Sequence, residues 1–232
     1  MLIDRVIAPY FETNCWILAS KIGQECIIVD PGMARPNLVN EIVTKVSEHN
    51  LKPIAVLITH GHLDHIFSVL PLTAQVPMRT FITPADRFLL TDPMGALDRN
   101  GISQQFLNAF GNEKLKEPDE IVELEDFETF ELAGMQITSI FAPGHTKGSV
   151  IFTVDDQQLI SGDVLFAGSI GRTDLPTGSA SQMRNTLRDR ILTLPDGLNV
   201  LPGHGGQTTI GIERVRNPYL QSDSRSEWAV RF

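Results

Sequence analysis

Residues 59–65 read Thr-His-Gly-His-Leu-Asp-His, which places four side chains that can bind a metal ion within six residues. This run directly follows residues 54–58, an apolar stretch typical of a buried strand. Its glycine lets the backbone bend, so the two histidines before the leucine and the Asp-His pair after it can turn toward two different ions. We therefore predict a metal centre at the end of this strand.

Three more candidate ligands share that context. His145, Asp163 and His204 each follow a short apolar, strand-like run and lie in or beside a glycine-containing turn. Loops at strand ends gather functional groups in α/β proteins, so we expect these side chains to meet the first cluster. A lone buried histidine is more often a hydrogen-bonded core residue, but the joint pattern favours a metal site. The predicted ligands are His60, His62, Asp64, His65, His145, Asp163 and His204.

The predicted ligand set contains no cysteine. Imidazole and carboxylate ligands favour a nitrogen/oxygen site for zinc, iron or manganese over a thiolate site. The spacing also differs from that of a zinc finger, which needs cysteine pairs, and from the helical His-Glu-x-x-His motif of metalloproteases.

The remaining pattern predicts one α/β domain covering residues 1–232, with a helical insertion over the core at about residues 91–120. Capping residues or apolar stripes predict helices that begin near Asn37, Thr83, Ser179 and Thr208. Apolar runs predict strands at residues 26–29, 54–58, 80–82, 137–141, 149–154, 158–161 and 200–201.

The composition disfavours nucleic acid and membrane as partners. The chain carries 28 acidic and 19 basic residues, a net charge of −9, without a dense basic cluster. The sequence contains neither the apolar core of a signal peptide at its start nor an apolar run of membrane-spanning length. Cys15 and Cys26 lie in apolar stretches, where buried free thiols are expected and a disulfide or metal role is the alternative. We expect a cytoplasmic protein that is a monomer or a small homo-oligomer.

The motif at residues 59–65 resembles the signature of the metallo-β-lactamase-fold hydrolases. Later motifs at residues 143–146, 162–163 and 202–205 occur in the order found in that family. The resemblance implies a four-layer αββα sandwich with two divalent ions, zinc being the expected metal and iron or manganese the alternatives. It assigns His60, His62 and His145 to the first metal and Asp64, His65 and His204 to the second, with Asp163 bridging both.

Within this family the chain is most similar to the short bacterial glyoxalase II branch, through residues 14–17, 29–32 and 203–211. That resemblance implies hydrolysis of a small thioester, S-lactoylglutathione or a related acyl thiol, by a hydroxide shared between the two ions. Asp64 is the candidate proton acceptor. Full-length glyoxalase II enzymes carry a C-terminal glutathione-binding domain, whereas 28 residues follow His204 in this chain. The thiol carrier is therefore left open.

Arg172 is the candidate for substrate binding. Its guanidinium can grip a substrate carboxylate in a forked geometry, or it can pair with Asp174 and stiffen the loop. Residues 171–174, Gly-Arg-Thr-Asp, also resemble a segment of persulfide dioxygenases, which use one iron on the same fold. That oxidoreductase is the alternative function, although the Pro-Gly-His-Gly motif at residues 202–205 argues against it.

Overall fold

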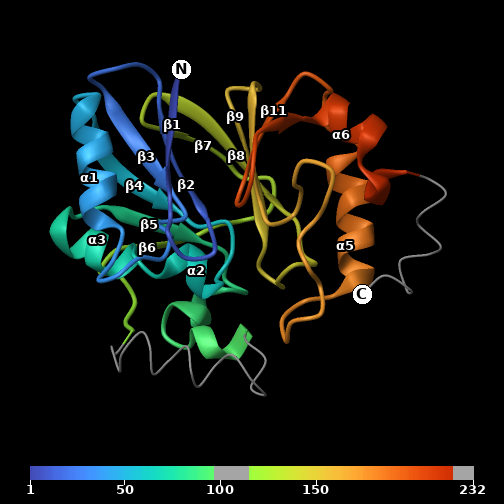
Figure 1. Cartoon of the computed structure of the whole chain (residues 1–232), viewed down its shortest axis with the longest axis horizontal. Helices are drawn as coiled ribbons and strands as arrows, with labels where there is room; N and C mark the ends of the chain where they lie inside the picture. The colour runs from blue at the N-terminus through green and yellow to red at the C-terminus, as the bar shows by residue number, and fades with distance from the viewer. Residues whose placement is uncertain (97–114, 222–232) are drawn as a thin grey trace.

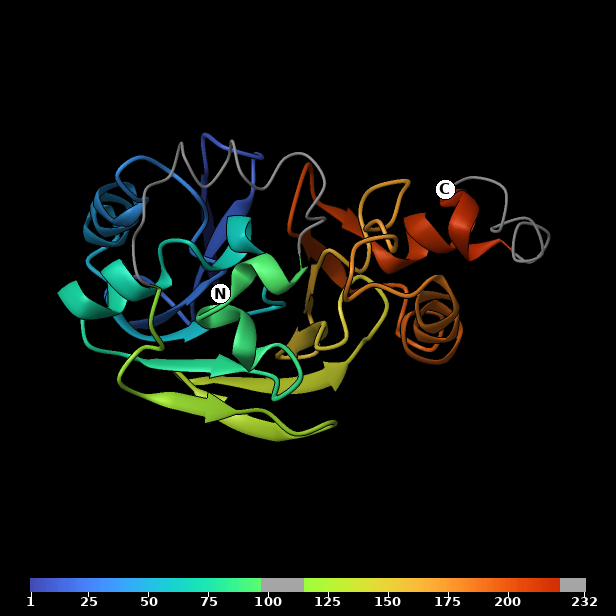
Figure 2. The ribbon, with the colours of Figure 1, turned by 90° about the horizontal axis from the view of Figure 1, so that it is seen from below.

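Two six-stranded sheets lie face to face, with helices covering the outer face of each (Figures 1 and 2). The computed structural model describes residues 1–96 and 115–221, and the numbers of strands and helices refer to those residues. The strand order is β1-β2-β3-β4-β5-β6 in the N-terminal sheet and β12-β11-β10-β9-β8-β7 in the C-terminal sheet. Figure 1 shows α1 and α3 on one side of the sheet pair and α5 and α6 on the other. The four-layer αββα architecture expected from the sequence is confirmed.

The N-terminal sheet is formed by β1 (Leu2–Ile7), β2 (Asn14–Ala19), β3 (Glu25–Val29), β4 (Lys52–Leu57), β5 (Arg79–Ile82) and β6 (Ile121–Glu123). The C-terminal sheet is formed by β7 (Thr129–Leu132), β8 (Met135–Phe141), β9 (Val150–Val154), β10 (Gln158–Gly162), β11 (Asn199–Pro202) and β12 (Thr208–Thr209). The helices are α1 (Val39–Glu48), α2 (Leu63–Ile66), α3 (Val69–Gln75), α5 (Ala180–Thr186) and α6 (Ile210–Arg216). Short 3₁₀ helices lie at η1 (Arg87–Leu90), η2 (Pro93–Ala96) and η4 (Pro218–Leu220), and η3 (Leu187–Ile191) is a π turn.

Parallel strand pairs determine where the helices lie. β3, β4, β5 and β6 pair in parallel, so the chain must cross back between them. The crossing from β3 to β4 is α1, which buries Ile42 and Val46 of the predicted apolar stripe together with Val39, while Leu38 of that stripe is the residue before the helix. β10 and β11 are also parallel, and the crossing between them contains α5 and η3.

Two helices predicted in the C-terminal half are present, one at its predicted cap Ser179 and the other capped one residue after its predicted start at Thr208. The Ser179 side chain accepts a hydrogen bond from the backbone N–H of Gln182, so α5 begins where expected. The apolar stripe of α5 continues into the π turn η3. The sequence pattern predicted one continuous helix across both elements. Thr209 caps α6, which ends at Arg216, two residues before Pro218.

Strands at the centre of the sheets are apolar on both faces because both faces are covered. In β3, Ile27 and Val29 pack between the sheets, while Cys26 and Ile28 pack under the outer helices. The two cysteines are buried free thiols, as predicted, and burial raises the pKa of Cys26 to about 12.

The prediction of a helix that begins at Thr83 is wrong. The chain turns at residues 83–86 and forms only the single 3₁₀ turn η1. The Thr83 hydroxyl donates to the carbonyl of Gly148 instead of capping a helix, and the Asp86 carboxylate is used by other loops. The predicted helical insertion at 91–120 falls largely on residues 97–114, outside the described residues. Within the described residues, no helix has the length and apolar character needed to cross a bilayer.

Candidate metal centre

All seven predicted ligands meet at one edge of the sheet pair. His60 and His62 lie in the turn after β4, and Asp64 and His65 lie on α2, whose first turn starts after His62. The C-terminal sheet contributes the other three from the loop after β8 and from the residues just beyond β10 and β11. These are His145, Asp163 and His204. Motifs far apart in the sequence therefore form one cluster.

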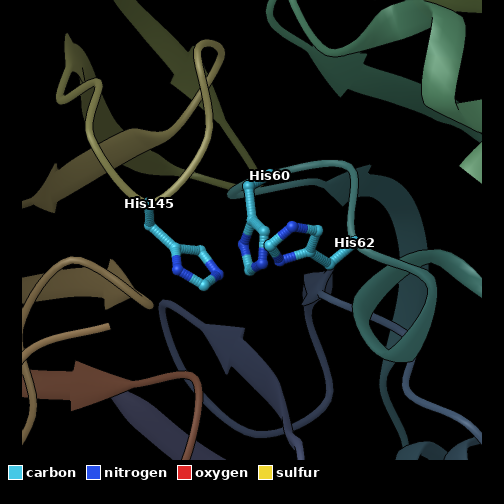
Figure 3. Close-up of side chains that lie close together, drawn as sticks. All are labelled: His60, His62 and His145. Atoms are coloured by element: carbon cyan, nitrogen blue, oxygen red, sulfur yellow. The ribbon is translucent and has the colours of Figure 1, made fainter. Parts of the chain in front are cut away.

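The first ligand set consists of His60, His62 and His145. Their ring centroids lie 4.5–4.7 Å apart, and Figure 3 shows the rings converging on one small space. One ligand atom from each ring lies within 4.8 Å of the others. The Nε2 atoms of all three rings are buried and have no hydrogen-bond partner among the described residues. Such orphaned buried nitrogens are costly unless a ligand satisfies them.

The second ligand set consists of Asp64, His65 and His204. The Nε2 atom of His65 lies 3.2 Å from Nε2 of His204 and 3.4 Å from Oδ2 of Asp64. His204 Nε2 lies 3.4 Å from the same Asp64 oxygen. Two atoms bound to one zinc ion at ~2.0–2.1 Å in tetrahedral geometry lie about 3.3 Å apart. The spacing of this set is therefore that of ligands around a common ion.

Asp163 reaches both sets. Its Oδ2 lies 3.5 Å from Nε2 of His145 and 3.4 Å from Nε2 of His204. Its Oδ1 lies 3.4 Å from Nε2 of His65, is buried, and has no hydrogen-bond partner among the described residues. A carboxylate in this position can contact two ions at once.

Four of the five rings are oriented through their other nitrogen. His65 Nδ1 lies 2.9 Å from the Asp30 carboxylate, and His60 Nδ1 lies 3.1 Å from the Thr59 hydroxyl. His145 and His204 bond through Nδ1 to backbone carbonyls, those of Arg172 at 2.7 Å and Phe11 at 2.9 Å. Partners on the remote nitrogen fix the ring and direct Nε2 toward a metal.

The first set is uncharged before it meets a metal. Burial, reinforced by neighbouring imidazoles, lowers the pKa of His60 well below its usual value and that of His62 to about 3. Burial also lowers the pKa of His145, although Asp163 opposes this effect. Neutral imidazole is the form that binds metals, so these rings are already competent at neutral pH.

The second set has the opposite electrostatic character. Burial lowers the pKa of His65 and His204, but the Asp163 and Asp64 carboxylates outweigh it and raise these values to about 9 and about 11. Burial favours the neutral form of both carboxyls, yet the two histidines lower their pKa values, to about 2 for Asp163. Paired carboxylates and imidazoles surround a position that favours positive charge. The nitrogen and oxygen donors of both sets suit divalent metal ions.

Arg172 contributes to the site through its backbone. Its carbonyl holds His145, while its exposed guanidinium forms a two-pronged pair with Asp174 at 2.7 Å for each contact. The sequence left both uses of the side chain open, and the structure contains the internal pair.

Several supporting residues were not predicted from the sequence. Thr13 donates its hydroxyl to Asp64 Oδ2 at 3.1 Å, and Asp30 binds both Thr59 and His65. Asp30 lies in the turn motif at residues 29–32, which carries part of the family resemblance but suggested no role for this residue. Nothing in the sequence indicated the supporting roles of Thr13 and Phe11, because an isolated threonine or a backbone carbonyl has no recognisable sequence pattern.

The chain belongs to the metallo-beta-lactamase superfamily, whose family model matches residues 8–204. A protein of Mycobacterium tuberculosis described as uncharacterized is 41% identical over 232 residues, covering 97% of this chain and 100% of its own. A probable metallo-hydrolase of Bacillus subtilis is 32% identical over 215 residues, covering 92% and 94%. The hydroxyacylglutathione hydrolase GloC of Haemophilus influenzae is 31% identical over 227 residues, covering 97% and 100%.

Several solved structures share this fold. The BLEG-1 B3 metallo-beta-lactamase is 31% identical with a TM-score of 0.82, covering 95% of this chain and 100% of its own. A protein in a di-iron-bound form is 30% identical with a TM-score of 0.75, covering 94% and 100%. ETHE1 from Myxococcus xanthus, at 23% identity and a TM-score of 0.76, covers 98% and 88% and shares the fold. Metal-dependent hydrolysis is the activity class that the family supports.

Replacing Gly203 tests how tightly Asp163 and His65 are packed. A Cβ added at Gly203 would overlap Oδ1 of Asp163 and lie 2.8 Å from Cε1 of His65. We expect Gly203→Ala to fold but to bind metal at least ~10-fold more weakly, because both ligands must shift. Competition with a chromophoric chelator measures this affinity. Gly206→Ala is the matched control, since its Cβ would meet nothing within 4 Å, and an equal loss in both variants would contradict the packing argument.

Metal binding at pH 7 is expected to release protons from the second set only. The pKa values of His65 and His204 are raised, so this pair holds a proton there that an ion must displace, whereas His60, His62 and His145 have none to lose. Calorimetric titration in buffers of different ionisation enthalpy counts these protons. The number should fall as the pH rises above about 9 and passes the His65 pKa. Equal proton release in both binding phases would show that the two sets do not differ in charge.

Proposed function

We propose that this protein is a binuclear thioester hydrolase of the glyoxalase II type. The observation that carries the proposal is the position of Asp163, whose oxygens lie 3.4–3.5 Å from histidines of both ligand sets. The full-length similarity to a hydroxyacylglutathione hydrolase supports the same assignment. Zinc is the proposed metal, with iron and manganese as the alternatives. The proposed substrate is S-lactoylglutathione or a related acyl thiol.

Two divalent ions held by these residues would supply Lewis acidity for the substrate carbonyl and lower the pKa of a coordinated water. The chain's own residues position the ions and accept the proton. Asp64 is the proposed proton acceptor, and the Thr13 hydroxyl, donating to its Oδ2, fixes its orientation. A thiolate is a good leaving group, so the described loops need not provide a strong acid for its departure.

The partner in this proposal is a small molecule, with neither nucleic acid nor a membrane involved. The proposed setting is the cytoplasm, with the protein acting as a monomer or a small homo-oligomer.

β-Lactam hydrolysis is a second candidate. It is favoured by the 31% identity and TM-score of 0.82 to the BLEG-1 B3 metallo-beta-lactamase. The same ligand atoms suit attack on a lactam carbonyl, and the choice of substrate then depends on the surrounding loops. The persulfide dioxygenase alternative is supported only by the segment at residues 171–174, since the likeness to ETHE1 shows the fold alone.

A substrate panel on zinc-loaded protein tests the function. We expect thiol release from S-lactoylglutathione or another acyl thiol, lost on chelation and restored by zinc, because attack and polarisation both need the ions. Thiol release is followed with a thiol-reactive dye, and metal content by elemental analysis. No release from several acyl thiols at full metal occupancy would refute the thioesterase proposal. Cleavage of a chromogenic β-lactam would then favour the second candidate, whereas one iron per chain with oxygen uptake on glutathione persulfide would favour the dioxygenase.

Arg172 is proposed to recognise an anionic group of the substrate by exchanging its Asp174 partner for a substrate carboxylate. Arg172→Ala should raise KM for S-lactoylglutathione about tenfold with kcat unchanged, because a charge-assisted contact worth about 1.4 kcal/mol is lost. The carbonyl that holds His145 is kept in this variant. Steady-state kinetics with charged and uncharged thiol carriers measures the effect.

The matched control for this prediction is Arg188→Ala. Arg188 forms a similarly exposed two-pronged pair with Asp189 on the π turn η3, at 2.6 Å for each contact. It should leave KM unchanged. If Arg172→Ala raises KM equally for the uncharged carrier, anion recognition is wrong and the loop acts only by its shape.

A further inference from the structure

Asp86 is a fully buried carboxylate that lies outside both ligand sets. It is the last residue of the turn that leads from β5, a strand of the N-terminal sheet, to η1. Three donors converge on it. The backbone N–H of Gly61 donates to Oδ2 at 2.8 Å, and the Thr146 hydroxyl donates to the same oxygen at 2.6 Å. The backbone N–H of Gly148 donates to Oδ1 at 2.8 Å.

These three donors come from the two loops that carry the first ligand set. Gly61 separates His60 from His62 after β4, and Thr146 directly follows His145 in the loop between β8 and β9. Figure 3 shows the His145 loop approaching the His60–His62 loop from the opposite side. One carboxylate therefore ties a loop of the N-terminal sheet to a loop of the C-terminal sheet at the point where their histidines meet.

Close packing around Asp86 leaves the two loops little freedom. A Cβ added at Gly61 would lie 2.5 Å from Cδ1 and 2.6 Å from Cβ of Leu89. A Cβ added at Gly148 would lie 2.5 Å from Cγ and 2.6 Å from the backbone nitrogen of Asp86. The Thr83 hydroxyl also donates to the Gly148 carbonyl at 2.6 Å. Both loops thus lie directly against residues 83–89, and the carboxylate bridges them.

The second ligand set has different supports. Asp64 accepts from Thr13, His65 is held by Asp30, and His204 is held by the Phe11 carbonyl. Asp86 is not among these contacts. The first set is therefore expected to depend on Asp86 in a way that the second does not.

We propose that Asp86 is a positioning residue that fixes the spacing of His60 and His62 relative to His145, and so sets the metal affinity of the first ligand set. It touches neither substrate nor metal and acts through Gly61, Thr146 and Gly148. The inference concerns the metal centre and holds whichever substrate the enzyme takes.

Asp86→Asn tests the proposal at constant side-chain size. An amide offers one acceptor oxygen, and its NH₂ group faces a donor in either orientation, so at least one of the three bonds is lost and replaced by repulsion. We expect zinc to bind 10- to 100-fold more weakly at one site per chain, a loss typical for partners that support metal ligands. Chelator competition measures the two affinities. Anomalous diffraction at limiting zinc shows which position loses occupancy, and it should be the one near His60, His62 and His145.

Thr13→Val is the matched control for the other set. It removes a single hydroxyl donor to Asp64 at nearly constant shape and should weaken the second position while sparing the first. Opposite occupancy patterns in the two variants support the proposal. Equal weakening at both positions in Asp86→Asn, or wild-type affinity, overturns it.

A third variant covers the case in which Asp86→Asn does not fold. Thr146→Val keeps the carboxylate and both backbone donors but removes the hydroxyl, and circular dichroism checks that the fold is retained. It should weaken the same position, by less than Asp86→Asn. Unchanged zinc affinity in Thr146→Val, with the fold intact, counts against Asp86 as the residue that sets the first set's affinity.

Discussion

The convergence of five imidazoles and two carboxylates on one sheet edge is the constraint on which the rest of the structure depends. Nε2 of His60, His62 and His145 and Oδ1 of Asp163 are buried without hydrogen-bond partners among the described residues. Each such atom costs about 1–3 kcal/mol unless something compensates. The compensation that suits these atoms is a divalent ion, which accepts lone pairs from nitrogen and oxygen without needing a proton.

The supports of the ligands also join the two halves of the molecule. β2 lies in the N-terminal sheet, yet the backbone N–H of Asn14 donates to the Gly203 carbonyl at 2.7 Å, and the Trp16 indole donates to the Pro202 carbonyl at 2.9 Å. Across the centre, Asp86 ties the His145 loop to the turn after β4. Because ligands and sheets share these bonds, a change that separates the sheets at this edge also moves the ligands. The metal centre and the sheet packing are thus one cooperative unit.

The sequence was most informative where one local pattern carried the answer. Central strands are apolar on both faces, so they were recognisable as apolar runs in the sequence. The ligands were recognisable because they come directly after these runs, in the loops at the strand ends that form the site. The helix expected at Thr83 failed because a capping threonine and a first-turn acid are local signals. In the folded chain both side chains serve distant loops, through Gly148 and Thr146. Asp86 and the Phe11 carbonyl could not be found from the sequence, because their roles exist only once two sheets are packed together.

The loop before β2 illustrates how backbone strain is maintained at such a centre. Phe11 and Glu12 adopt φ values of 62° and 57°, a left-handed conformation that costs side-chain-bearing residues about 1–2 kcal/mol each. The loop is closed by the bond from the Ala8 N–H to the Thr13 carbonyl and by the bridge between Thr13 and His204. In this conformation the Phe11 carbonyl accepts from Nδ1 of His204, while Thr13 reaches Asp64. A relaxed loop would aim the carbonyl elsewhere and leave His204 free to rotate, so the strain is the cost of fixing two ligands of the second set from a single turn.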